Sequence, residues 1–110
     1  MILGTEYEIN QQTLEENKAF EDCDGYCDPS VKKIFYRKYE NQPDSFDYLC
    51  RDDMQKKTLR HEIVHAFMYE SGLWRNAGVP GAWSMNEEMV DWIAIQFPKI
   101  AAVYEELGIL

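Results

Sequence analysis

The residues whose types and spacing suit chemistry lie in one short segment, His61-Glu62-Ile63-Val64-His65, which reads H-E-x-x-H. Positions four apart lie on one face of an α-helix, so both imidazoles can reach a single metal ion. Glu62 then lies beside them, where it can take a proton from a water near that metal. The pattern is typical of zinc-dependent peptide hydrolysis, with His61 and His65 as ligands and Glu62 as general base.

A third protein ligand must be a carboxylate or a thiol, because both histidines of the chain lie in the motif. The best candidates lie in the acidic segment 86–91. Glu87 and Asp91 are four apart, so both can face the same way on a helix. We predict that Glu87 is the ligand and that Asp91 accepts the outer N–H of a ligating histidine. Glu88 or Asp91 as the third ligand stays an open alternative.

Plainer interpretations exist for each of these acidic residues. Ser84 and Glu87 have the spacing of a capping box, in which Glu87 would fold back onto its own helix. Glu62 would be an exposed carboxylate, and Asp91 would be half of a structural salt bridge among apolar neighbours. We favour the metal site because the motif and the second acidic pair occur together.

The three cysteines, Cys23, Cys27 and Cys50, are odd in number. Cys23 and Cys27 are four apart, but no matching second pair exists, so a separate metal site is disfavoured. We expect reduced, packed thiols.

The spacing of these residues resembles the gluzincin pattern of thermolysin-like peptidases. In that pattern an Asn-Glu pair gives the third zinc ligand and an aspartate four residues on supports a histidine; here Asn86-Glu87 follows the motif and Asp91 follows Glu87. The resemblance extends over residues 58–97. The metzincin pattern fits worse, because it needs glycine and histidine where this chain has Met68 and Ser71.

The chain is similar to small metallopeptidase-like proteins of phages and mobile elements, some of them ImmA/IrrE-like, in its short length, its acidic balance and the turn at 26–28. This resemblance implies a zinc cofactor and a protein or peptide substrate of regulatory character. It also implies that the strand around 34–39 lines the cleft and holds an extended peptide by strand addition.

Composition limits the partners. The net charge is −9 and the pI about 4.6, with no basic stripe to neutralise phosphates, so nucleic acid and anionic membrane are disfavoured. The segment 1–6 lacks the features of a signal peptide, and no apolar run is long enough for a transmembrane helix. We therefore expect a cytoplasmic protein.

The motif needs a helix to position it. Asp52 or Asp53 can cap such a helix, which we expect to end near Gly72. A second helix is predicted over 86–97, apolar on most sides and therefore central. Pro98 is predicted to interrupt it and to open a final helix.

Alternation of apolar and polar residues predicts a strand over 3–9, and β-branched and aromatic residues predict another over 31–39, with lysines guarding a sheet edge. Thr13 and Glu16 resemble a capping box that opens a short helix. Polar loops are expected at 41–47 and 73–83.

We expect residues 1–110 to form a single minimal zinc metallopeptidase-like domain of α+β class. In it, a small, mainly antiparallel sheet packs on the motif helix, and a second helix contributes the third ligand. The function expected is that of a zinc-dependent peptidase. The alternative is a non-catalytic zinc-binding module that works by protein interaction.

Overall fold

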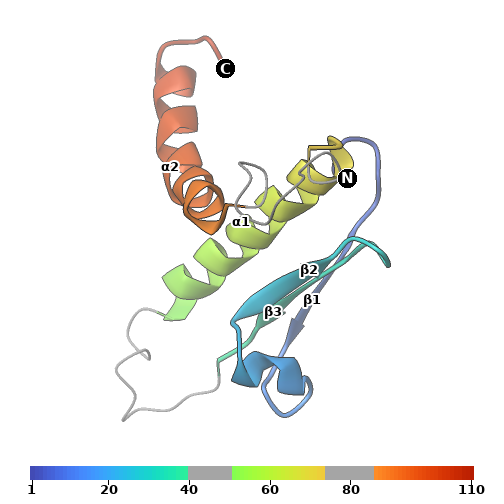
Figure 1. The fold of residues 1–110 in the computed structure, drawn as a ribbon. Coiled ribbons are helices and arrows are strands. Elements are labelled where there is room, and N and C mark those ends of the chain that lie inside the picture. Colours follow the sequence, from blue (N-terminus) through green and yellow to red (C-terminus); the bar gives the residue numbers. More distant parts are fainter. Residues whose placement is uncertain (40–50, 74–85) are drawn as a thin grey trace.

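The computed structural model describes residues 1–39, 51–73 and 86–110. The α+β class is confirmed, with a three-stranded sheet on one side of α1 and α2 crossing its other side (Figure 1). The elements are β1 (Glu8–Gln12), the 3-10 helix η1 (Lys18–Glu21), β2 (Gly25–Asp28), β3 (Lys33–Arg37), α1 (Arg51–Glu70) and α2 (Glu87–Glu106). Within the described ranges, neither helix has the length and apolarity needed to cross a bilayer.

The sheet is mixed, with strand order β1-β3-β2. β1 runs parallel to β3, whereas β2 runs antiparallel to it, so antiparallel pairing accounts for one of the two strand pairs. The prediction of an edge strand at 31–39 is wrong, because β3 is the central strand and Ile34 is fully buried. Lys32 does not guard an edge; it reaches Glu70 at the end of α1 instead, at 2.6 Å.

The strand predicted to begin at Leu3 begins only at Glu8. Leu3 and Gly4 both adopt positive φ, 47° and 84°, and make a tight turn closed by hydrogen bonds between Ile2 and Thr5. The alternating pattern therefore covers a turn as well as a strand. Ile2 is buried by this turn and joins a core with Ile34 and Ala66.

The segment after β1 forms a turn where an α-helix was predicted. Thr13 and Glu16 make the reciprocal hydrogen bonds of a capping box. The helix that follows is the short 3-10 helix η1, and its N-cap is Asn17. A capping box satisfies its own backbone donors without requiring a long helix beyond it.

α1 ends where the sequence predicts, with Gly72 at a φ of 86° directly after its last turn. That left-handed conformation is favourable for glycine and is common just beyond a helix end. Ala66 faces the sheet core, while Glu62 is the buried acidic residue of this helix. The predicted loops at 41–47 and 73–83 lie outside the described residues, apart from Leu73.

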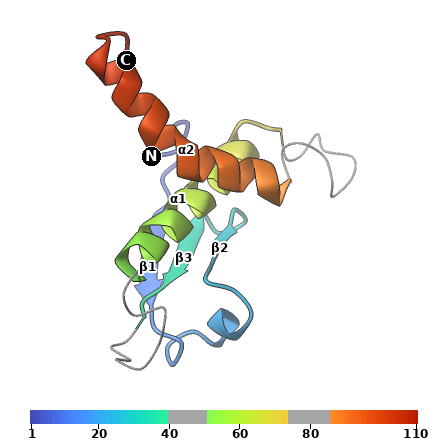
Figure 2. The ribbon, with the colours of Figure 1, turned by 90° about the vertical axis from the view of Figure 1, so that its left-hand side faces the viewer.

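α2 differs from the prediction in two ways. It continues through Pro98 to Glu106, and Figure 2 shows its axis changing direction between its orange and red halves. It is also not central, because Trp92 and Phe97 are 55% and 57% exposed. Only the narrow face of α2 that carries Val90 and Ala94 is fully buried among its described residues.

Candidate metal centre

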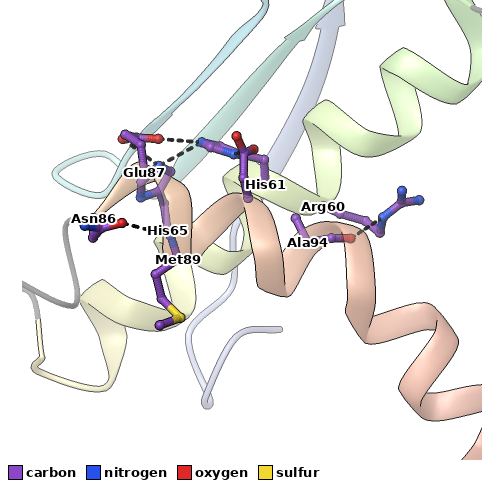
Figure 3. Close-up of polar contacts among 8 residues, drawn as sticks. Arg60, His61, His65, Asn86, Glu87, Met89 and Ala94 are labelled. Atoms are coloured by element: carbon purple, nitrogen blue, oxygen red, sulfur yellow. Dashed lines mark hydrogen bonds and ion pairs between the residues drawn. The ribbon is translucent and has the colours of Figure 1, made fainter.

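Three predicted ligands lie together where α1 and α2 cross (Figure 3). The Nε2 atoms of His61 and His65 are 3.0 Å apart. One carboxylate oxygen of Glu87 lies 3.0 Å from His61 Nε2, and the other lies 3.3 Å from His65 Nε2. The two imidazoles project from consecutive turns of one helix, and the carboxylate comes from the first turn of the other.

The chemistry and spacing of these three residues can be compared with those of a zinc site. Tetrahedral ligands about 2.0–2.1 Å from one ion lie about 3.3 Å from each other, and the two histidine nitrogens are 3.0 Å apart. Each of these nitrogens contacts a different oxygen of the Glu87 carboxylate, and one donor atom from each of the three residues can be chosen so that all lie within 4.8 Å of one another. Two imidazole nitrogens with one carboxylate oxygen are a donor set that zinc favours in catalytic sites. The residues present therefore fit zinc, and their role as ligands stays a prediction.

Glu87 is available for this site because another residue caps its helix. The Asn86 side chain accepts a hydrogen bond from the backbone N–H of Met89 at 2.9 Å, as an N-cap does. Glu87 is then the first helical residue, and its side chain is turned to the histidines (Figure 3). The capping-box interpretation of Glu87 is therefore wrong; Ser84 lies outside the described residues. Glu88 is not part of the cluster.

Asp91 lies one turn further along α2 and contacts the other nitrogen of His61. Its Oδ1 is 2.7 Å from His61 Nδ1. A hydrogen bond donated from Nδ1–H to this carboxylate leaves Nε2 with its lone pair directed at His65 and Glu87. We predicted that Asp91 would support a histidine, and the plainer interpretation was that it forms a structural salt bridge. Both interpretations describe this one contact between Asp91 and His61.

Glu62 is buried, with 6% of its surface exposed, so its interpretation as an exposed carboxylate is wrong. Burial raises the pKa of Glu62 to about 7; His61 lowers it, and the negative charges of Glu87 and Asp91 add to the rise. A carboxyl group with a pKa near neutrality both accepts and returns protons at neutral pH.

Burial also lowers the pKa of His65, against the opposing pull of Glu87. The imidazole is thereby kept neutral at neutral pH. A neutral imidazole has the lone pair that metal binding requires.

The cluster opens onto a cleft of about 560 Å³ with walls from α1, α2 and β2. Gly25 stands where β2 meets α1, and a Cβ there would lie 2.7 Å from the Thr58 methyl and 3.4 Å from Glu62 Cγ. The absence of a side chain at Gly25 thus lets the strand approach Glu62 closely. The sequence showed Gly25 only as part of a turn, because no local signal marks a contact with α1 more than thirty residues later.

Cys23 and Cys27 also line this cleft, and both are free thiols. Cys27 is half-buried, and burial, with Glu62 as a second cause, raises the pKa of its thiol to about 12. Cys23 is exposed, so the expectation of a packed thiol is wrong there. Cys50 lies outside the described residues.

Arg60 is the residue of this region that sequence reasoning missed. Its Nε donates a hydrogen bond to the backbone oxygen of Ala94 at 2.8 Å (Figure 3). The sequence feature that could have indicated this contact is Pro98, because a proline removes the helical hydrogen-bond donor of the carbonyl four residues earlier.

Comparison with protein-family models, with curated proteins and with solved structures finds no match. These comparisons therefore identify neither a gluzincin nor an ImmA/IrrE-like protein, and both resemblances stay predictions from the sequence.

Proposed function

We propose that this chain is a zinc-dependent peptidase of minimal gluzincin type. The observation that carries the proposal is the convergence of His61, His65 and Glu87, whose donor atoms lie within 4.8 Å of one another, directly beside a buried glutamate. A structural metal site does not require a titratable carboxyl group at an open cleft, whereas a hydrolytic site requires one as general base.

Each residue then has a defined task. His61, His65 and Glu87 hold the metal, and Asp91 fixes the orientation of His61 through its Nδ1–H. Bound zinc supplies Lewis acidity toward a carbonyl group and lowers the pKa of a coordinated water. Glu62 takes the proton from the attacking water and returns it to the leaving amine.

The substrate is a protein or peptide segment in extended conformation. β2 lines the cleft and is an edge strand, with no partner on its outer side among the described residues. Strand addition at this edge gives main-chain hydrogen bonds without regard to sequence. The strand first expected to do this, β3, is paired on both sides and is unsuitable. By the motif resemblance, the setting is the cytoplasm of a bacterium or of a phage-infected cell.

The test combines metal analysis with the variant Glu62→Gln. Glutamine has nearly the same shape but cannot accept the proton of the attacking water. We expect wild type and variant to bind one zinc ion each, and the variant to cleave a peptide library at least about 100-fold more slowly.

Wild-type protein that binds no zinc would overturn the proposal. Protein that holds zinc but cleaves no peptide would instead support the alternative, a non-catalytic zinc-binding module that acts by protein interaction.

A further inference from the structure

Pro98 leaves a vacant acceptor inside α2. Proline has no backbone N–H, so the carbonyl of Ala94, four residues earlier, lacks its α-helical donor. Ala94 is 2% exposed, so water is kept away from this residue. A buried carbonyl without a donor is destabilising, and the helix needs a partner for it from elsewhere.

Arg60 of α1 supplies that partner. Its Nε donates to the Ala94 oxygen at 2.8 Å, and the bond joins the two helices rather than two turns of one (Figure 3). The donor is charged, which makes this contact stronger than an ordinary amide hydrogen bond.

This bond lies beside the metal cluster on both helices. Arg60 directly precedes His61 on α1, and Ala94 follows Asp91 by three residues on α2. The Arg60–Ala94 and His61–Asp91 contacts therefore connect neighbouring points of the same crossing, at 2.8 Å and 2.7 Å. The second contact belongs to the site itself, whereas the first touches none of its ligands.

We propose that Arg60 is a positioning residue, which uses the carbonyl freed by Pro98 to hold α2 where Glu87 and Asp91 meet the two histidines. This inference rests on the proposed zinc site. The buried residues of α2, Val90 and Ala94, are small and apolar, and their packing alone is not directional. A hydrogen bond to one carbonyl fixes both the distance and the rotation of the helix.

Two variants of Arg60 separate this role from charge and packing. Arg60→Met keeps the side chain only as far as the position of Nε, where it places a methyl group. Arg60→Gln places an amide N–H at the same position. Both variants remove the same positive charge, so any electrostatic effect on the metal is shared by the pair.

We expect Arg60→Met to bind zinc about tenfold more weakly than wild type, a loss typical of residues that orient ligands. Arg60→Gln should restore most of this affinity. With cobalt in place of zinc, the visible spectrum of Arg60→Met should change shape, because the ligand geometry changes, while that of Arg60→Gln stays close to wild type.

A second experiment needs no metal. In the metal-free protein, Arg60→Met should lower the midpoint of urea unfolding when residue 98 is proline. The same change should lower it less in the Pro98→Ala background, because an alanine at this position gives the Ala94 carbonyl a helical donor of its own.

The outcomes distinguish this inference from the function on which it rests. Wild type that binds no zinc overturns both. Wild type that binds zinc, with Arg60→Met equal to it or with both Arg60 variants equally weak, overturns the positioning role alone. Equal loss of stability in the wild-type and Pro98→Ala backgrounds also overturns it, because the bond to the freed carbonyl would then be immaterial.

Discussion

Glu87 and Glu88 are neighbours in sequence, yet only Glu87 faces the two histidines. One residue step turns a helix by about 100°, which separates their side chains completely. We predict that Glu87→Gln weakens zinc binding by more than about 100-fold, beyond the loss expected for an orienting residue. The matched control Glu88→Gln should leave affinity unchanged. Competition against a chromogenic chelator measures the zinc affinity of both variants. A larger loss of affinity in Glu88→Gln would mean that Glu88, not Glu87, is the ligand.

At the proposed zinc site, Asp91 would act through His61, which it contacts, rather than directly. Asp91→Asn keeps an oxygen that can accept from His61 Nδ1–H at the present 2.7 Å but removes the negative charge. A neutral acceptor makes the imidazole a weaker base, so we predict a loss of about tenfold in zinc affinity. The same titration measures it. A loss as large as that of Glu87→Gln would indicate that Asp91 is itself a ligand.

The approach of β2 to α1 depends on Gly25. A methyl group there would lie 2.7 Å from the Thr58 methyl and 3.0 Å from the Phe35 carbonyl oxygen, so strand and helix would have to separate. We predict that Gly25→Ala destabilises the protein by about 1–3 kcal/mol and slows peptide cleavage, since the strand borders Glu62.

Thr58→Ser removes one of the two obstacles and serves as the rescue. Added to Gly25→Ala, it should recover part of the lost stability in urea unfolding, with the backbone contact to Phe35 accounting for the rest. Full stability in Gly25→Ala alone would show that β2 and α1 lie farther apart than the 2.7 Å contact with Thr58 implies.

The end of α1 is attached to two other segments through Glu70. Its carboxylate accepts hydrogen bonds from Lys32 at 2.6 Å, Tyr7 at 2.7 Å and Thr5 at 3.2 Å. The contact with Lys32 is the main cause that holds the pKa of Glu70 below its usual 4.5, with Tyr7 next. Because the pKa is lowered in the folded state, this stabilisation is complete above the unfolded value and disappears as the pH falls through the folded one.

Glu70→Gln should therefore be less stable than wild type at pH 7, and the difference should shrink as the pH falls below about 4.5. Urea unfolding at a series of pH values measures this. Glu106→Gln, at the exposed end of α2, is the control and should follow wild type throughout. A difference that persists unchanged in acid would mean that the charge of Glu70 is unimportant.

The parts of this structure that the sequence predicts are those set by local spacing. His61 and His65, or Glu87 and Asp91, share a helix face because four residues make about one turn. Two helices, the end of α1 and the α+β class follow from the same short-range signals. The position of β3 does not, because it depends on parallel pairing with β1, which is distant in sequence. The helix through Pro98 was also missed, because its missing hydrogen bond is replaced from another helix.

The part of the core formed by residues 1–39, 51–73 and 86–110 is small for the number of elements that it joins. Among the described residues the buried apolar side chains are Ile2, Phe20, Ile34, Ala66, Met68, Val90 and Ala94. Only two of these lie on α2. In the C-terminal half of this helix the side chain of Val103 is exposed, and so is that of Leu107 at the C-cap. Among the described residues, α2 thus contributes two fully buried apolar side chains, Val90 and Ala94, to the fold.

A metal bound between the two helices would add to the junction of α1 and α2. An ion that binds only the folded state stabilises it by about 2.7 kcal/mol when free zinc is about 100 times the dissociation constant. For a chain of this size that corresponds to a rise in Tm of about 10 °C. We predict this rise on adding zinc and its reversal by a chelator, measured by scanning calorimetry. Glu87→Gln should show a much smaller rise at the same zinc concentration. An equal rise in wild type and variant would mean that zinc stabilises the fold from somewhere other than the crossing of α1 and α2.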